Sequence, residues 1–551
     1  MIDRRTFLAG FAVACAAPLI SGCSDGPFGT AADSQAASEA DLSVRFPSVT
    51  TMDPACIREY GDICLCSQLY EPLMRYDYRE HALAGGAARS VEVSPDARTV
   101  TFLLEHGRTF ANGKPLGSRA FVDSWNRLVH LEGERIREEG EAVSGFASLL
   151  AAVEGFDEVI SGEATELSGL ETPDADTLIV HLSRPCAEFP VVSSHVALSP
   201  VFLGEDAGSV DGLEPIGNGP YRLKGAFKAN GPLMLVPNDS HRASSRARTI
   251  QIVCEKDAGN AYKQFEAGNI AVTEVPIDQV EAVRKSSGVS SSGYVAVPGE
   301  RLIDGISFNQ IMLGCNMSST ALSFAELRHA VCSAVDRESL CEKVLKGSFS
   351  PSSRFISAAL DDGADFVVEG CSYDPEYAAS LIEPVYPAGE DGKRGLRFSL
   401  LCSNRGVDPK VAEAVANDLR DLGIEVDVKA YAWSEYRGRL VDRDFDLALL
   451  SQTPFCPSYE ASLRPWLWSG ASATTNVSGF SVPEVDEALE SLAVQPQHDR
   501  AREQAVAIQA VISEQMPYIP VATRLLDTVV AREVENLQVN PYGVPLLDTL
   551  S

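Results

Sequence analysis

A helix that passes directly into a strand is the first indication of the fold class. Apolar residues recur at helical spacing over residues 408–422, and Gly423 follows as a helix-ending residue. Apolar residues then alternate over residues 424–428, as they do in a strand. Together with earlier runs such as the strand pattern over residues 177–182, this alternation indicates α/β lobes.

The chain is long and strongly acidic. Its 551 residues are enough for two or three domains with large cores. Lys plus Arg total 46 against 77 Asp plus Glu, which leaves a formal charge of −31. Because phosphate backbones and anionic lipid surfaces repel such a chain, we expect no nucleic-acid partner. We expect a monomer that stays soluble at high copy number.

The first 23 residues have the parts of a bacterial secretory signal. A basic start with Arg4-Arg5 precedes an apolar run that is too short for a membrane span of about 20 residues. The run ends in Ile20-Ser21-Gly22-Cys23, which is similar to a lipobox, where the cysteine is acylated and becomes the mature N-terminus. We therefore expect a lipoprotein signal peptide over residues 1–23, with Cys23 as the lipidation site.

Two alternatives stay open at this end of the chain. Cys23 could be incidental to an ordinary cleaved signal, and residues 4–8 also resemble a twin-arginine export signal. Residues 24–40 are rich in Ser, Ala, Gly and acidic residues and contain almost nothing to bury, which predicts a flexible tether. The expected location is extracytoplasmic, anchored by lipid at the outer face of the cytoplasmic membrane or in a periplasm.

The cysteines and histidines indicate neither an enzyme nor a metal site. Eleven cysteines follow Cys23, none in a C-x-x-C pattern, and we expect most of them to be buried as small apolar residues. A local disulfide among Cys56, Cys64 and Cys66 is the main alternative. Residues 22–26 match G-x-S-x-G only across the signal cleavage point, and the chain has no H-E-x-x-H and no P-loop. We predict no catalytic residue, no metal ligand and no cofactor.

A series of collinear motifs is similar to the family 5 extracellular solute-binding proteins, which include oligopeptide- and dipeptide-binding proteins. Each motif alone is weak, but they occur in the family's order over about 500 residues of this chain. The matching segments are Met52–Pro54, Leu69–Asp77, Val93–Leu116, Phe121–Leu128, Pro215–Tyr221, Phe308–Asn309, Leu327–Glu338, Leu422–Val426 and Pro517–Pro520.

The resemblance implies a two-lobed periplasmic-binding-protein-like α/β fold of the large, peptide-binding type, with an extra subdomain in the first lobe. Lobe I would comprise residues 41–76, 165–268 and 505–551, and the extra subdomain residues 77–164. Lobe II would comprise residues 269–504. Two chain crossings would form a hinge, and the lobes would close over a ligand bound between them.

The function implied is that of the substrate-binding lipoprotein of an ABC importer, which captures peptides and delivers them to a permease and ATPase complex. The alternatives are a non-peptide solute, such as a nickel chelate, haem or a sugar, and a role as a peptide sensor or adhesin. In oligopeptide-binding relatives the peptide backbone is held like an added strand, so that affinity depends little on sequence.

The same resemblance suggests ligand-binding residues in both lobes. In the first lobe they follow the Met52–Pro54 motif, and in the second they comprise a tryptophan and the loop after the strand at residues 447–452. The candidates are Arg58, Glu59, Tyr60, Trp433, Gln452, Thr453, Phe455 and Tyr459.

The loop after that strand departs from the family pattern. Oligopeptide-binding members carry an Asp there, preceded by a Trp, that pairs with the peptide's α-amino group, whereas residues 451–459 contain neither. A buried ammonium without a carboxylate costs on the order of several kcal/mol. Either Glu59 or Glu460 supplies the charge, or the ligand has no free amine at that point.

Overall fold

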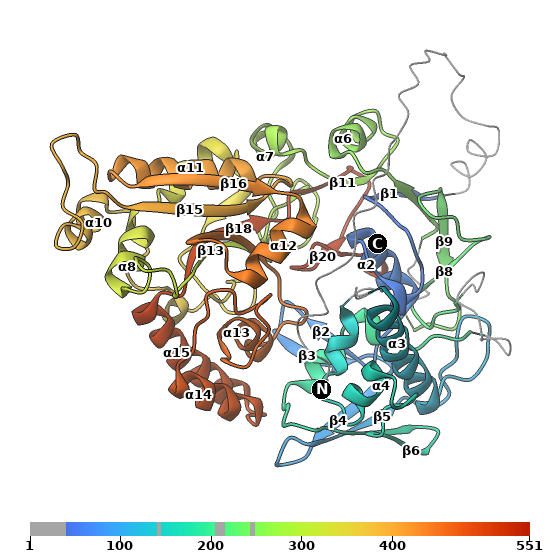
Figure 1. Ribbon diagram of the computed structural model, residues 1–551. Coiled ribbons are helices and arrows are strands. Elements are labelled where there is room, and N and C mark those ends of the chain that lie inside the picture. The colour runs from blue at the N-terminus through green and yellow to red at the C-terminus, as the bar shows by residue number, and fades with distance from the viewer. Residues whose placement is uncertain (1–39, 140–144, 204–214, 243–247, 551) are drawn as a thin grey trace.

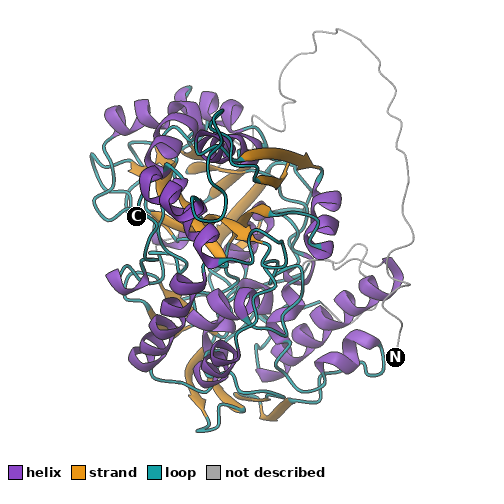
Figure 2. Cartoon of the chain, turned by 60° about the vertical axis from the view of Figure 1, so that its left-hand side comes forward, coloured by secondary structure: helices purple, strands orange, loops and turns teal. Residues whose placement is uncertain are grey.

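The computed structural model describes residues 40–139, 145–203, 215–242 and 248–550 (Figure 1). The expected signal peptide, Cys23 and all of the tether except Ala40 lie outside these ranges. One group of strands lies among helices in the upper part of the molecule, and another lies at its lower edge (Figure 2). No helix in the described ranges is both long and apolar enough to cross a bilayer.

The first lobe is built on a mixed sheet whose central strand comes from the start of the body. The strand β1 (Leu42–Phe46) buries Leu42, Val44 and Phe46, and it runs parallel to both of its neighbours. The sheet has the order β12 (Leu302–Ile303), β19 (Thr528–Val530), β11 (Val272–Glu274), β1, β10 (Ile250–Cys254), β9 (Leu233–Pro237) and β8 (Tyr221–Leu223).

Helices and the end of the chain complete the first lobe. The helix α2 (Tyr60–Leu69) packs on this sheet with the short pair β20 (Gln538–Val539) and β21 (Pro545–Leu546). The helices α6 (Ala258–Glu266) and α7 (Val280–Ser287) lie beside β11 and β12.

The extra subdomain is an antiparallel sheet covered by one long helix. The sheet has the order β4 (Ala88–Val93), β5 (Thr99–Leu104), β7 (Thr177–His181) and β6 (Leu170–Asp174). Trp125 of α3 (Ser118–Glu139) is fully buried, and its indole N–H donates to the carbonyl of Leu198 at 2.9 Å. The subdomain also contains α4 (Phe156–Ser161) and α5 (Phe189–Val192), and the pair β2 (Met74–Asp77) and β3 (Ala82–Gly85) precedes it.

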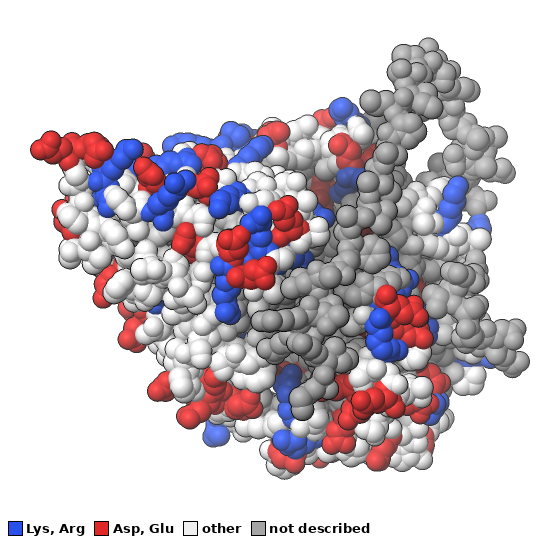
Figure 3. All heavy atoms as spheres, viewed as in Figure 1, with Lys and Arg blue, Asp and Glu red and all other residues white. Residues whose placement is uncertain are grey.

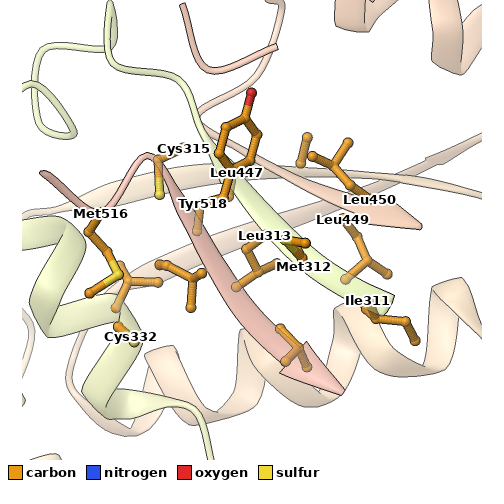
Figure 4. Packing of buried hydrophobic residues seen from close by; sticks show 14 of the residues in the cluster. Ile311, Met312, Leu313, Cys315, Cys332, Leu447, Leu449, Leu450, Met516 and Tyr518 are labelled. Atoms are coloured by element: carbon orange, nitrogen blue, oxygen red, sulfur yellow. The ribbon is translucent and has the colours of Figure 1, made fainter. Parts of the chain in front are cut away.

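The second lobe has its own mixed sheet and the largest core. The order is β14 (Phe349–Pro351), β18 (Tyr518–Leu525), β13 (Ile306–Cys315), β17 (Leu447–Gln452), β15 (Arg397–Ser403) and β16 (Glu425–Tyr431). Buried residues of β13, β17 and β18 pack together in Figure 4. The surrounding helices are α8 (Ala325–Ala334), α9 (Arg337–Ser339), α10 (Pro375–Ile382), α11 (Asp408–Asp421), α12 (Trp433–Asp442), α13 (Tyr459–Leu467), α14 (Pro483–Ala493) and α15 (His498–Gln515).

The helix–strand passage that indicated the fold class is confirmed. The helix α11 buries its apolar face in the second-lobe core, and β16 follows it and pairs in parallel with β15. Parallel pairing of strands connected by a helix is the arrangement expected of an α/β lobe.

The chain crosses between the two sheets at positions that differ from the expected ones. In the described chain, β12 continues through Asp304-Gly305 into β13, and β18 continues through Leu526-Asp527 into β19. The boundaries expected at residues 268 and 504 are therefore wrong. The strands β11 and β12 hydrogen-bond into the first sheet, whereas α15 and β18 belong to the core of the second lobe.

The expected end of the extra subdomain at residue 164 is also too early. The strands β6 and β7 lie beyond that point, and β7 pairs with β5 over the register Thr99 to His181. Both errors have one cause. Strand partners that are distant in sequence decide where a lobe ends, and their pairing leaves no local signal.

A buried carboxylate holds the first-lobe loop that leads toward the cleft. Asp62 in α2 is fully buried, and it accepts hydrogen bonds from the backbone N–H groups of Thr50, Thr51, Arg58 and Glu59. It also accepts one from the Thr50 hydroxyl at 2.9 Å. The loop over residues 50–59 is therefore wrapped around a single side chain.

Replacing the Asp62 carboxylate should make the protein less stable against unfolding. We expect Asp62→Ala to lower the free energy of unfolding by about 3–5 kcal/mol, because several buried N–H groups lose their acceptor. Urea titration followed by circular dichroism measures the change. Asp123→Ala removes a carboxylate that is 58% exposed and serves as the control. Equal midpoints for the two variants would show that Asp62 does not hold the loop.

Candidate ligand-binding cleft

A cavity of about 970 Å³ lies between the lobes. Both sheets, the crossing at residues 526–527 and the end of the chain contribute to its wall. First-lobe residues include Arg45, Tyr60, Glu71, Arg75, Tyr76, His195, Lys256 and Glu274. Second-lobe and crossing residues include Asn309, Arg405, Trp433, Ser451, Thr453, Phe455, Arg524 and Asp527, and the C-terminal segment adds Tyr542 and Asp548.

Two aromatic side chains of the second lobe face the cavity with much of their surface free. Trp433 begins α12 and is 44% exposed, and the Arg405 guanidinium lies 5.1 Å from the centre of its ring. Phe455 is 49% exposed and meets the ring of Phe146, from the extra subdomain, at 5.7 Å. Exposed aromatic rings in a cleft provide large contact areas for a ligand.

In the first lobe the structure separates the three neighbouring candidates. Tyr60 lines the cavity, and its hydroxyl donates to the carbonyl of Gly543 at 2.5 Å. Arg58 and Glu59 are exposed outside the cavity lining, and Glu59 is the N-cap residue of α2. Of this group, only Tyr60 is placed where a ligand in the cleft could touch it.

The candidate residues at the end of β17 and after it also differ in whether they line the cavity. Thr453 lines the cavity, as does Phe455, whereas Gln452 and Tyr459 are buried in the second lobe. The amide of Gln452 donates to the carbonyl of Ser462 at 3.2 Å, and the Tyr459 hydroxyl donates to Asp361 at 2.8 Å. These two residues support the loop, and the expectation that they bind ligand directly does not fit their positions.

Strand alternation explains which of these side chains face the cavity. Side chains on a strand point to opposite faces in turn, so Ser451 and Thr453 lie on the face opposite to that of Gln452. The Asn309 amide donates to the hydroxyls of Ser451 at 2.9 Å and of Thr453 at 3.0 Å. Neither Asn309 nor Ser451 was among the sequence candidates, although the alternation of β17 was a signal that could have found Ser451.

The cavity lining carries balanced charge, unlike the chain as a whole. Among the described residues that line it, five are Arg or Lys and five are Asp or Glu. Glu274 lies 3.3 Å from Arg45 and 3.8 Å from Arg524. At another part of the wall, Arg75 lies 3.4 Å from Asp548. Basic and acidic side chains are also interspersed over the outer surface of the second lobe in Figure 3.

Asp527 is the least compensated carboxyl group of the lining. It is 3% exposed, sits at a crossing with a φ of +49°, and its Oδ1 accepts no hydrogen bond within the described chain. Burial raises the pKa of Asp527 to about 7, and the nearby Asp304 carboxylate adds to the increase. The Ser348 hydroxyl and the guanidinium groups of Arg524 and Arg284 oppose it by lowering the pKa.

The extra subdomain contacts the second lobe beside the cavity. The backbone N–H of Glu460 donates to the Glu188 carboxylate at 3.1 Å, and Arg184 lies 3.1 Å from Glu460. Burial raises the pKa of Glu188 to about 7, and the neighbouring Glu460 carboxylate adds to this increase. Glu460 itself is buried and paired with Arg464 at 2.7 Å.

These contacts show whether Glu59 or Glu460 can replace the Asp that is absent from the loop over residues 451–459. Glu59 is exposed outside the cavity lining, and Glu460 is used by the interlobe contact, so neither carboxylate faces a ligand in this structure. The positions of these two carboxylates therefore do not support either of them as the amine acceptor, and that alternative stays a prediction. Within the described ranges, no group of three or more His, Cys, Asp or Glu side chains is arranged to hold a metal ion.

Comparisons with known proteins agree with this geometry. Residues 82–474 match the model of the bacterial extracellular solute-binding proteins, family 5 (middle region). The chain is 25% identical to the periplasmic murein peptide-binding protein MppA of Escherichia coli K12, over 86% of this chain and 85% of MppA. It is also 25% identical to the periplasmic oligopeptide-binding protein OppA of Haemophilus influenzae, over 82% of each chain.

A solved structure shows the same fold. The unliganded open form of the murein tripeptide-binding protein MppA superposes with a TM-score of 0.76 at 23% identity, covering 92% of this chain and 96% of that one. A relative with a different ligand is heme-binding protein A of Haemophilus influenzae, which is 21% identical over 86% of this chain and 85% of its own length. The large two-lobed binding-protein fold predicted from the sequence is confirmed.

The raised pKa of Asp527 predicts how stability depends on pH. The native state holds a proton on Asp527 up to about pH 7, whereas the unfolded carboxyl group, with an ordinary pKa of 3.8, loses it earlier. Stability from this group is therefore present at low pH and lost as the pH rises through about 7, with a slope of up to about 1.4 kcal/mol per pH unit. We expect Asp527→Asn to make this slope less steep.

Urea unfolding at intervals between pH 4.5 and 7.5 measures the slope. Glu188→Gln should flatten it in the same sense, because burial raises the pKa of Glu188 as well. Asp123→Asn, at an exposed position, is the control. Identical slopes in the Asp527→Asn variant and the parent chain would contradict the assignment.

Proposed function

Because the chain belongs to the family 5 bacterial extracellular solute-binding proteins, we propose that it captures peptides in the interlobe cleft and delivers them to the permease and ATPase of an ABC importer. The observation that carries the proposal is the cavity of about 970 Å³, which both lobes line with charged groups of both signs and the second lobe lines with two exposed aromatic rings. Peptides carry an amine, a carboxylate and apolar side chains, and this lining offers a counterpart to each.

The positions of the crossings support a mechanism of capture. Two neighbouring connections, at residues 304–305 and 526–527, allow one lobe to rotate against the other with little change inside either core. Ligand bound to both walls would favour the closed state, because only that state makes both sets of contacts. The importer's membrane subunits would then recognise the closed lobes. No catalytic role is proposed for any residue.

The interlobe contact of Glu188 and Glu460 lies away from the crossings and supports the same mechanism. Ala187 also donates its backbone N–H to the carbonyl of Ala493 at 2.7 Å, so the extra subdomain and the second lobe touch directly. Such a contact would limit how far the lobes turn about the crossings, which would set the width of the cleft.

The missing acid of the 451–459 loop leads to a narrower hypothesis on the ligand. Among the cavity carboxylates, Glu71, Glu274 and Asp548 are already paired with arginines, and Asp408 and Asp527 belong to other segments than this loop. We therefore propose that the ligand presents no free amine at this loop. Tight binding of an ordinary tripeptide that is lost when its N-terminus is acetylated would refute this hypothesis without affecting the cleft itself.

A non-peptide solute, such as haem, a nickel chelate or a sugar, is the second candidate ligand class. It is supported by the relative that is named a heme-binding protein. A role as a peptide sensor or adhesin would use the same cleft and would differ only in the partner that recognises the closed state.

Ligand class and the role of the aromatic wall can be tested together. Native mass spectrometry of the chain purified without denaturation should release a ladder of peptide masses. Titration calorimetry with those peptides should show a dissociation constant about tenfold higher for Trp433→Ala, because an exposed aromatic anchor is lost.

Trp468→Ala is the matched control for this experiment. Trp468 is also partly exposed and also lies near an arginine, with the Arg464 guanidinium at 5.4 Å, but it does not line the cavity. Release of a single non-peptide mass would overturn the peptide assignment. Equal affinity of the Trp433→Ala variant and the control would remove Trp433 from the site.

We further propose that Cys23 is lipidated and anchors the mature chain outside the cytoplasm. Cys23→Ala should abolish incorporation of labelled fatty acid and release the protein from the membrane fraction, because no other acyl attachment site follows from the sequence. Cys15→Ala, within the expected leader, should leave labelling unchanged. Labelling that persists in the Cys23→Ala variant would contradict the assignment.

A further inference from the structure

Two cysteine sulfurs meet inside the second lobe, far from each other in sequence. The Sγ atoms of Cys332 and Cys371 are 2.9 Å apart, although the residues are 39 positions apart in the sequence, and both side chains are buried. Cys332 lies on α8 and points into the core in Figure 4. Cys371 lies in the connection just before α10, which packs beside α8.

This pair is unlike the other cysteines. All eleven cysteines of the described chain are free thiols in this structure, Cys332 and Cys371 included, and no other pair of their sulfurs is in hydrogen-bond contact. The local disulfide considered among Cys56, Cys64 and Cys66 therefore has no sulfur contact to support it. Neither Cys332 nor Cys371 lines the interlobe cavity.

A buried arginine contacts the sulfur pair. Arg337 is 5% exposed, and within the described residues no carboxylate lies within ion-pair distance of it. Its guanidinium donates to the carbonyls of Pro520 at 2.8 Å and of Cys371 at 2.9 Å, and to the Sγ of Cys332 at 3.3 Å. The cation therefore sits against a sulfur rather than against an acid.

The contacts favour one protonation pattern in the reduced pair. The Cys371 hydrogen bond and the Arg337 cation lower the pKa of Cys332 against the opposing effect of burial. The same hydrogen bond raises the pKa of Cys371, and burial adds to that increase. In the folded lobe, Cys332 is thus the more acidic thiol of the pair. A thiolate is the nucleophile in thiol–disulfide exchange.

We propose that Cys332 and Cys371 are joined as a disulfide in the exported protein, where they tie α8 to the segment before α10. The inference rests on the proposed location outside the cytoplasm, since disulfides persist in oxidising compartments. It assigns a covalent link within the second lobe in addition to the binding function of the cleft.

The oxidation needs a disulfide donor of the thiol–disulfide oxidoreductase class. One cysteine of the pair, as its thiolate, attacks one sulfur of the donor disulfide, which forms a mixed disulfide and releases the donor's other sulfur as a thiolate. The second cysteine loses its proton and attacks the protein sulfur of the mixed disulfide, which forms the protein disulfide and releases the second donor thiolate. The two electrons and two protons of the cysteine pair end on the donor as a dithiol.

The order of events follows from burial. Both sulfurs are enclosed in the folded lobe, so the donor must act before α8 and the 371 segment are packed, during or just after export. Arg337 links the pair to β18 through Pro520, and β18 leads into the crossing at residues 526–527. The link would therefore stiffen the part of the lobe on which closure turns.

Peptide mapping of the full-length chain recovered from outside the cytoplasm tests the proposal. Free thiols are alkylated under denaturing conditions, and the chain is then cleaved with trypsin without reductant. Peptides His329–Arg337 and Phe355–Lys393 each contain one cysteine. We expect them as one linked mass that separates on reduction. Recovery of both as alkylated single peptides would overturn the proposal.

Matched variants separate the disulfide from simple packing. In Cys332→Ser, the peptide with Cys371 should become fully alkylated, and reductant should no longer change the thermal unfolding midpoint. In the parent chain, reductant should lower that midpoint by several degrees, since the cross-link restricts the unfolded state. Cys341→Ser, at a buried position that is 3% exposed in the same core, should keep both the linked mass and the response to reductant.

The outcomes also distinguish this inference from the proposed function. A chain found only in the cytoplasm would overturn the proposed export, whatever the state of its cysteines. An exported chain that binds peptide but carries two free thiols would overturn only the disulfide. A reductant-insensitive unfolding midpoint in the exported parent chain would do the same.

Discussion

The architecture depends on two neighbouring chain crossings that pair with each other. Ile303 faces Thr528 at the edge of the first sheet, Ile306 faces Leu525 at the start of the second, and Leu526 donates its N–H to the carbonyl of Gly305 at 3.0 Å. Gly305 is required there, because a Cβ would lie 2.5 Å from the carbonyl oxygen of Gly293. The two lobes are thus joined by a short antiparallel ribbon, which can twist while each core stays packed.

Charge is concentrated where this ribbon meets the cavity. Asp304 pairs with Arg284, and Arg524 lies near Glu274, so the crossings carry ion pairs that face both lobes. Asp527 is buried among them with a pKa raised to about 7 by that burial. Arg524 and Asp527 also line the cavity, so a charged ligand in the cleft would contact groups at the connection about which the lobes turn.

The sequence predicted the kind of fold better than its boundaries. The helix at 408–422, the strand after it and the two-lobed architecture are confirmed, because periodicity and capping are local properties of the chain. The boundaries at 268 and 504 are wrong because β11 pairs with β1 and β18 pairs with β13, over separations that no local pattern records. Among the site candidates, Tyr60, Trp433, Thr453 and Phe455 line the cavity, whereas Arg58 and Glu59 are exposed outside it and Gln452 and Tyr459 are buried.

The sequence by itself determined the elements, the family and the excess of negative charge, since each of these follows from residue order and composition. Only the tertiary structure decided which side chains face the cleft, how its lining comes to be balanced in charge, and that Cys332 meets Cys371. These features depend on contacts between residues tens to hundreds of positions apart. Such contacts form only when the strands pair in one register and each helix buries one particular face in the packed core.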